Sequence, residues 1–277
     1  MQSIYTPPVC CLEELNHLFI ELTSKNCNQR CKKCFIDFPF SRNVKDFIQI
    51  DKIKQALVDT KSEPIKCIYL TGAEPMTHPD FNSILRLCLK RGNVCVLTNA
   101  TFINEKKARF LKKVEEESEY QIIFKLSFAH YDEVKNDDVR FRGSFRQNMY
   151  ALKCLDKYNF TNVICVNNYY KEDENVVISE FKKIIETMDL SSVILQTTKW
   201  YDKENLDHTE NVIGNFDCKR GRLLTQNGVF ACSFLTNDYR GRMGTDMKDF
   251  SKNVRLETPC CATCISNKEP MFGIEIS

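Results

Sequence analysis

The segment between residues 18 and 196 alternates between runs typical of β-strands and runs typical of amphipathic helices. Apolar, β-rich runs lie at 18–22, 65–70, 93–98, 121–127, 162–167 and 193–196. Apolar residues at helical spacing lie between them, at 48–57, 80–91, 104–116, 145–158 and 176–188, with Ser144 as the expected N-cap of the fourth helix. This order predicts a parallel sheet with right-handed crossovers. Because six units are fewer than the eight of a closed barrel, we predict an α/β fold with a partial (β/α)6 barrel, open along one side.

Three cysteines follow the first predicted strand within eight residues: Cys27, Cys31 and Cys34, spaced C-x3-C-x2-C. Soft thiolates favour iron–sulfur clusters or zinc. A structural zinc site usually takes four protein ligands, often as two C-x2-C pairs, so this triplet fits zinc poorly. Three thiolates can hold three irons of a [4Fe–4S] cluster and leave the fourth iron open. The simpler alternative is three incidental core cysteines in a cysteine-rich chain.

The ends of the predicted strands carry polar residues, which matters because barrels of this kind place their chemistry at the C-terminal strand ends. After the cysteine triplet, these ends are Gly72-Ala73-Glu74-Pro75, Thr98-Asn99, Ser127, Asn167-Asn168 and Gln196-Thr197. Each would be an ordinary polar strand end on its own. Together they predict one site on one rim of the barrel.

The alternation ends near residue 199, and cysteines then return at positions 218, 232, 260, 261 and 264. Residues 226–232 contain a turn followed by a short strand, which predicts a hairpin. Cys218, Cys232 and the C-x2-C pair of Cys261 and Cys264 form a four-thiolate set suited to zinc or to a [4Fe–4S] cluster. Cys260 is a bystander, a replacement for Cys261, or a free thiol near the substrate.

The composition is that of an ordinary globular protein, with 43% hydrophobic and 27% charged residues and a net charge of +2. This charge gives no case for binding nucleic acid or an anionic membrane. The sequence contains no apolar run long enough to span a bilayer, and it does not begin with the layout of a signal peptide. We therefore expect a cytoplasmic protein without a membrane or nucleic-acid partner.

Cysteine usage agrees with this compartment. The number of cysteines, fifteen, is odd, and they are unevenly spread along the chain. Both features favour metal binding over a disulfide framework. Cys10 and Cys11 are expected to be packing or incidental residues. Small core residues are expected at Cys67, Cys88, Cys95, Cys154 and Cys165.

The cysteine triplet and the stretch from Gly72 to Asp80 resemble the radical S-adenosylmethionine (SAM) superfamily. The resemblance implies that Cys27, Cys31 and Cys34 bind a [4Fe–4S] cluster whose open iron is chelated by SAM. It implies SAM contacts from Phe35, Gly72, Glu74, Asn99, Ser127, Asn167 or Asn168, and Gln196, with Glu74 accepting from the SAM ammonium group. Three positions depart from the family pattern: Lys33 replaces a common aromatic residue, Ala73 the second glycine, and Ala100 the glycine after Asn99.

Beside such a core, the C-terminal cysteines resemble the shortened SPASM, or twitch, domain. This resemblance implies an auxiliary [4Fe–4S] cluster bound by Cys218, Cys232, Cys261 and Cys264. The expected organisation is an N-terminal lead-in at 1–16, a radical SAM partial TIM barrel at 17–198 and a twitch/SPASM-like domain at 199–277.

The implied activity is reductive cleavage of SAM to a 5′-deoxyadenosyl radical, which abstracts hydrogen from a substrate carbon. Modification of a ribosomal peptide by oxidation, cross-linking or epimerisation is the first expectation. A dehydrogenase or epimerase of a small molecule such as an aminosugar or cyclitol is the alternative, and an epimerase would use Cys260 as its first candidate hydrogen donor. A one-electron reductant such as flavodoxin or ferredoxin is the expected partner. A non-catalytic, zinc-stabilised scaffold is the alternative from another class.

Overall fold

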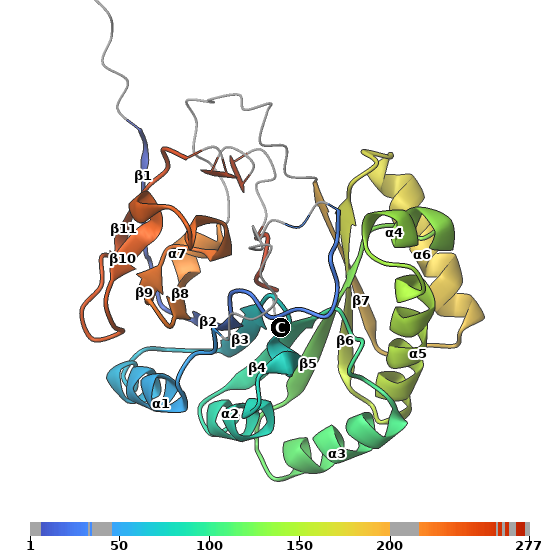
Figure 1. The fold of residues 1–277 in the computed structure, drawn as a ribbon, viewed down its shortest axis with the longest axis horizontal. Helices are drawn as coiled ribbons and strands as arrows, with labels where there is room; N and C mark the ends of the chain where they lie inside the picture. The colour runs from blue at the N-terminus through green and yellow to red at the C-terminus, as the bar shows by residue number, and fades with distance from the viewer. Residues whose placement is uncertain are drawn as a thin grey trace, which may run out of the picture.

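The computed structural model describes residues 7–32, 34, 46–199, 216–258, 260–261, 264–265 and 270–274. Its centre is a curved nine-stranded sheet with the order β10-β9-β8-β2-β3-β4-β5-β6-β7 (Figure 1). The six predicted strands are β2 (His17–Thr23), β3 (Cys67–Gly72), β4 (Asn93–Thr98), β5 (Ile122–Phe128), β6 (Thr161–Asn168) and β7 (Val193–Lys199). Each is parallel to the next, so the partial (β/α)6 barrel is confirmed.

Helices line the outer side of the curved sheet (Figure 1). They are α1 (Ile50–Asp59), α2 (Phe81–Cys88), α3 (Glu105–Glu116), α4 (Glu133–Val139), α5 (Ser144–Lys157) and α6 (Glu174–Thr187). Alternate strand residues such as Ile20, Leu70 and Val96 point toward these helices and form the main core with their apolar faces. Among the described residues, no helix combines the length and apolar character needed to cross a membrane.

The inner face of the sheet carries a second core, formed by the other set of alternating residues. Phe19 stacks on Tyr69 with ring centroids 4.4 Å apart, and Cys95 and Ile123 continue this layer. The segment at 270–274 lies inside the curve of the sheet, where its apolar side chains complete the inner core (Figure 1). The barrel interior is therefore partly filled by a segment from the far end of the chain.

The C-terminal part extends the sheet beyond β2. It contains α7 (Asp217–Arg220), β8 (Gly221–Thr225), β9 (Gly228–Phe230), β10 (Arg242–Gly244) and β11 (Asn253–Arg255), with 3-10 turns η2 (Ser233–Leu235) and η3 (Tyr239–Gly241). Strand β8 is parallel to β2, whereas β9 is antiparallel to both β8 and β10. The predicted hairpin is confirmed, and the structure adds β8 as a strand that the sequence pattern did not reveal.

The N-terminal lead-in packs against this C-terminal part. Its strand β1 (Val9–Cys11) is antiparallel to β11 (Figure 1). The backbone N–H of Leu12 donates to the carbonyl of Lys252 at 2.7 Å, and that of Leu256 donates to Pro8 at 2.8 Å. The division at 1–16, 17–198 and 199–277 stays a prediction.

Helix α4 was not expected, because its sequence has no helical apolar period. Its N-cap is Asp132, which accepts from the Lys135 N–H. Asn136 fixes the helix to its surroundings: its Oδ1 accepts from the Ala129 N–H at 2.9 Å and its Nδ2 donates to the Ser144 hydroxyl at 2.9 Å. Polar contacts thus replace the apolar face that sequence patterns detect.

The predicted N-cap of α5 is wrong by one residue. Gly143 occupies the N-cap position with φ +81°, and Ser144 is the first helical residue. The Ser144 hydroxyl is instead held by Asp137 Oδ1 at 3.0 Å. Because Asp137 also accepts from the Phe145 N–H, a carboxylate on α4 caps α5 in place of the expected local side chain.

The turn after β3 requires glycine at position 72. Gly72 has φ +131°, and a Cβ there would lie 2.3 Å from the Thr23 carbonyl oxygen. At Gly92, by contrast, an added Cβ would lie 3.5 Å from the nearest atom, in ordinary van der Waals contact. This pair gives a matched test of the turn after β3.

We predict that Gly72→Ala lowers the free energy of unfolding by about 2 kcal/mol or more, because it adds backbone strain and a clash. Gly92→Ala, the control, should change it by less than about 0.5 kcal/mol. Urea unfolding followed by circular dichroism measures both. Equal stability of the two variants would contradict the prediction.

Candidate active site

The loop that carries the cysteine triplet is joined to the end of β3. Thr23 Oγ1, at the end of β2, accepts from the Asn26 N–H at 3.0 Å and so turns the chain toward Cys27. The Asn26 carbonyl then accepts from the Glu74 N–H at 3.0 Å, while the Ala73 N–H donates to the Thr23 carbonyl at 2.8 Å. Ala73 is not among the residues with positive φ, which explains why alanine can replace the second glycine there.

Glu74 is fully buried, and its carboxylate is held by three donors. Oε1 accepts from the Met76 N–H at 3.1 Å and from the Thr98 hydroxyl at 2.8 Å, and Oε2 accepts from the Asn99 N–H at 2.8 Å. Burial raises the pKa of Glu74 to about 7, although these hydrogen bonds act in the opposite direction. The carboxylate is thus preorganised, and any further hydrogen-bond donor that approaches it would stabilise its charged form.

Asn99 connects Glu74 to the cysteine loop. Its backbone contacts Glu74, while its Nδ2 donates to Asn28 Oδ1 at 2.9 Å and lies 3.6 Å from the Cys27 sulfur. The Gln29 N–H also points at this sulfur, at 3.4 Å. Ala100 has φ +61°, so the chain keeps the left-handed turn without the usual glycine. One residue therefore places a predicted cluster ligand beside the buried carboxylate.

Helix α4 supports the same loop from the other side. The Lys32 N–H donates to the Val139 carbonyl at 2.8 Å, and Arg140 Nη2 donates to Gln29 Oε1 at 3.3 Å. An ion pair joins Lys32 to Asp138. These supporting residues were not predicted, because they lie in or next to an unexpected helix and their charges carry no spacing signal.

The two neighbouring asparagines at the end of β6 make different contacts in the structure. Asn168 closes the following loop: its Nδ2 donates to the Glu172 carbonyl at 2.7 Å and its Oδ1 accepts from the Glu172 N–H at 3.0 Å. Asn167 points to the opposite face of the strand, and its buried Oδ1 has no hydrogen-bond partner among the described residues. Asn167 is therefore the better candidate for a ligand contact.

Two other predicted contacts lie on the strands of the barrel, and one falls outside the described part. Ser127 is half-buried on β5, and its carbonyl accepts from Asn148 Nδ2 at 2.8 Å. Gln196 on β7 faces the 270–274 segment, where its Nε2 lies 3.3 Å from the carbonyls of Pro270 and Gly273. Within the described part of the chain, its buried Oε1 is unpartnered. Phe35 lies outside the described residues.

The C-terminal cysteines meet at a small, partly open cavity. Five thiols line it, from Cys218, Cys232, Cys260, Cys261 and Cys264. Its other walls are mainly apolar, with Phe216, Phe234 and Leu235 among them. Burial raises the pKa of the Cys232 thiol to about 12. This thiol therefore stays neutral until a cation or metal stabilises the thiolate.

The remaining cysteines follow the expected pattern with one exception. Cys67, Cys88, Cys95 and Cys154 are buried core residues, whereas Cys165 is half-buried on β6. All fifteen cysteines lie in the described part, and none of them forms a disulfide there. Among the described residues, no three His, Cys, Asp or Glu side chains are arranged as a metal site. The ligand sets at both ends of the chain stay predictions.

The family model of the radical SAM superfamily matches residues 22–189, which is more than half of the chain. The chain belongs to the radical SAM superfamily. It is accordingly a radical SAM enzyme that uses SAM and a SAM-binding [4Fe–4S] cluster. The matched range contains the cysteine triplet, Glu74 and the polar ends of β4 to β6. No curated protein matches the chain.

Two solved structures share the fold at low sequence identity. SuiB of Streptococcus suis, bound to its precursor peptide SuiA, is 15% identical with a TM-score of 0.62, covering 84% of this chain and 63% of SuiB. A tagged form of anSMEcpe with bound AdoMet is 17% identical with a TM-score of 0.62, covering 87% of this chain and 77% of anSMEcpe. The chain thus spans under two thirds of the length of SuiB. These similarities show the fold: a partial barrel and a small C-terminal antiparallel region.

The residues of this radical SAM enzyme suit the groups that its family uses. The two N–H groups that point at the Cys27 sulfur are of the kind that tunes iron–sulfur clusters. The Asn167 Oδ1, unpartnered among the described residues, is a buried acceptor available to a ligand. The thiol-lined cavity offers soft ligands in an apolar setting.

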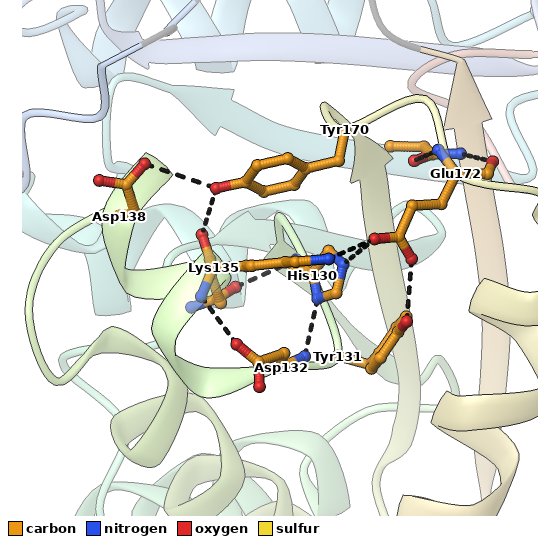
Figure 2. A network of polar contacts seen from close by, with 9 residues as sticks. His130, Tyr131, Asp132, Lys135, Asp138, Tyr170 and Glu172 are labelled. Atoms are coloured by element: carbon orange, nitrogen blue, oxygen red, sulfur yellow. Dashed lines mark hydrogen bonds and ion pairs between the residues drawn. The ribbon is translucent and has the colours of Figure 1, made fainter.

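A polar network joins the loops that follow β5 and β6 (Figure 2). Glu172 Oε1 lies 2.9 Å from His130 Nε2 and 2.5 Å from Lys135 Nζ, and Oε2 accepts from the Tyr131 hydroxyl at 2.9 Å. Because the Asp132 N–H donates to Nδ1 of His130, the Nε2 nitrogen carries the ring proton. The donors from Lys135 and His130 lower the pKa of Glu172 to about 2.

The same network reaches the cysteine loop. The Tyr170 hydroxyl lies 3.3 Å from the Lys135 carbonyl and 3.4 Å from Asp138 Oδ2 (Figure 2). Asp138 in turn forms an ion pair with Lys32. A chain of polar contacts therefore runs from the loop after β6 to the loop after β2. His130, Lys135 and Glu172, at the centre of this network, are not among the residues predicted to touch SAM.

We predict that Glu172→Gln lowers the free energy of unfolding by about 1 kcal/mol at pH 7, because the variant loses a carboxylate held by three donors. The folded-state pKa is depressed, so this stabilisation is present above the usual glutamate pKa and is lost as the pH falls toward 2. Urea unfolding at pH 7 and pH 3 should show the gap between wild type and variant narrowing. The control is Glu117→Gln, which removes one exposed ion pair to Arg86 and should have little effect at either pH. A gap that widens at pH 3 would contradict the assignment.

Proposed function

We propose that this radical SAM enzyme modifies a ribosomal peptide, with an auxiliary [4Fe–4S] cluster in its C-terminal part. The observation that carries the SAM-dependent part of the proposal is the position of Asn99. Its N–H lies 2.8 Å from the Glu74 carboxylate and its side-chain amide lies 3.6 Å from the Cys27 sulfur. The predicted cluster ligand and the predicted acceptor for the SAM ammonium thus meet at one point of the rim.

Bound SAM and its cluster supply reductive cleavage to a 5′-deoxyadenosyl radical, which takes hydrogen from a substrate carbon. Cys27, Cys31 and Cys34 would hold that cluster. Glu74 Oε2 accepts from the Asn99 N–H, and a carboxylate oxygen has lone-pair capacity left for an ammonium donor. A charge-assisted hydrogen bond in this buried setting would orient SAM toward the barrel interior.

The C-terminal cavity would hold the auxiliary cluster through Cys218, Cys232 and the pair at 261 and 264. Four protein thiolates would complete its coordination, so this centre would exchange electrons and would not bind SAM. Cys260 lies in the wall of the same cavity, where its sulfur is 2.9 Å from the Thr258 hydroxyl. A flavodoxin or ferredoxin is the reductant that we propose.

The peptide substrate is supported by fold similarity. SuiB was solved with the precursor peptide SuiA, and native anSMEcpe with AdoMet and the Cp18Cys peptide, the latter at 16% identity with a TM-score of 0.60 over 87% of this chain and 80% of that one. Comparing short peptides and metabolites in cells with and without the active protein tests this part. Accumulation of an altered small molecule, with peptides unchanged, would contradict it.

Anaerobic reconstitution tests the two-cluster proposal. We expect about eight irons per chain in the wild type, and 5′-deoxyadenosine after addition of SAM and a strong reductant. Replacing Cys27, Cys31 and Cys34 together by alanine should leave about four irons and abolish 5′-deoxyadenosine, because only the closed centre remains. A colourless, zinc-loaded wild type that leaves SAM intact would contradict the proposal.

A matched pair of variants tests the SAM contact on β6. We expect Asn167→Ala to weaken SAM binding about 2- to 10-fold, equivalent to one hydrogen bond, with little change in Tm. Asn168→Ala should instead lower Tm, because it opens the loop to Glu172. Equilibrium dialysis with SAM and a thermal melt separate the two effects. The reverse pattern would assign the SAM contact to Asn168.

A further inference from the structure

Cys10 lies against a predicted ligand of the C-terminal cluster, although the two are far apart in the sequence. Its sulfur is 3.4 Å from the Cys218 sulfur. Cys10 is the central residue of β1 and is 3% exposed, whereas its neighbours Val9 and Cys11 face outward. The strand thus directs one thiol into the apolar cluster that surrounds the cysteine cavity.

The backbone holds Cys10 in this place from two sides. Strand β1 pairs with β11, and the adjoining Val254 and Leu256 line the cavity. The Glu13 N–H donates to the Lys219 carbonyl at 2.8 Å, and the Asn16 N–H donates to Arg220 at 3.0 Å, so the chain after β1 is fastened to helix α7. Cys218 belongs to that helix. The contact between the two thiols is therefore built by secondary structure.

With Cys10 beside the five thiols that line the cavity, six thiols lie in this region, two more than one cluster requires. They fall into two close pairs and two single residues. Cys10 and Cys218 form one pair. Cys260 and Cys261 form the other, with sulfurs 2.9 and 3.1 Å from the Thr258 hydroxyl. The four thiolates of a [4Fe–4S] cluster each bind a different iron and point toward different corners. The Cys10 and Cys218 sulfurs, 3.4 Å apart, are too close to occupy two corners, so we infer that this pair supplies one ligand.

We propose that Cys10 and Cys218 share one ligand position of the C-terminal cluster, which makes the N-terminal strand part of the metal centre. This inference rests on the auxiliary cluster of the proposed function. The sequence favoured a packing role for Cys10, and its contact with Cys218 changes that assignment. Either thiol can serve the same iron, because a small side-chain rotation exchanges two sulfurs that already touch.

The test uses the full chain with Cys27, Cys31 and Cys34 replaced by alanine, so that any iron bound belongs to the C-terminal centre. Into this parent we introduce Cys10→Ala, Cys218→Ala or both changes, and Cys11→Ala as the control on the exposed side of the same strand. Serine versions repeat the series with less loss of volume, and circular dichroism confirms folding. Iron and sulfide per chain and the electron paramagnetic resonance spectrum of the reduced protein are measured.

We expect about four irons in the parent, in the control and in each single variant, with altered resonance in the single variants. The double variant should bind almost no iron. Loss of iron in Cys218→Ala alone, or in Cys10→Ala alone, would overturn the sharing, as would four irons in the double variant. A parent without iron would overturn the auxiliary cluster itself, and this failure is seen before any change at Cys10 or Cys218.

Discussion

The rim of this radical SAM enzyme depends on one buried carboxylate. Glu74 follows β3 and accepts hydrogen bonds from the end of β4, so it fixes two neighbouring strand ends to each other. The Glu74 N–H donates to the Asn26 carbonyl in the cysteine loop. Burying a carboxylate is costly unless donors compensate for lost water, and three donors do so here. The close approach of β2 at Gly72 makes this geometry possible.

The large features of the fold could be predicted because each has a repeating physical cause. Each helix between two strands crosses the sheet and covers its outer face, so consecutive strands run parallel. This gives the order from β2 to β7. Helix α4 was not predicted, because polar contacts of Asn136 and Asp132 hold it in place and it lacks an apolar face with helical spacing. Strand β1 has three residues and a single inward side chain, too short for any period to be visible.

The site shows the same division between local pattern and tertiary contact. Spacing was enough to single out the cysteine triplet and Glu74, because the residue types and their order are local properties. Ranking Asn167 above Asn168 as the candidate contact required the structure, since only the fold shows which amide closes the loop to Glu172. Gln196 lies against the 270–274 segment, a contact between residues distant in the sequence that no local pattern encodes.

The same 270–274 segment joins the barrel to the cysteine cavity. Asp217, next to Cys218, accepts from the N–H groups of residues 271, 272 and 273, each at 2.8 Å. On the barrel side, the buried Lys125 of β5 donates to the carbonyl of Phe272 at 2.8 Å, and the Tyr69 hydroxyl contacts the Ile274 backbone. A carboxylate and an ammonium thus hold opposite sides of one peptide segment. Both side chains are buried. Shifting the helix that carries Cys218 would therefore break the hydrogen bonds of Asp217 to the 270–274 segment, with no water to replace them. The position of the cavity is therefore fixed relative to the sheet that bears the candidate SAM site.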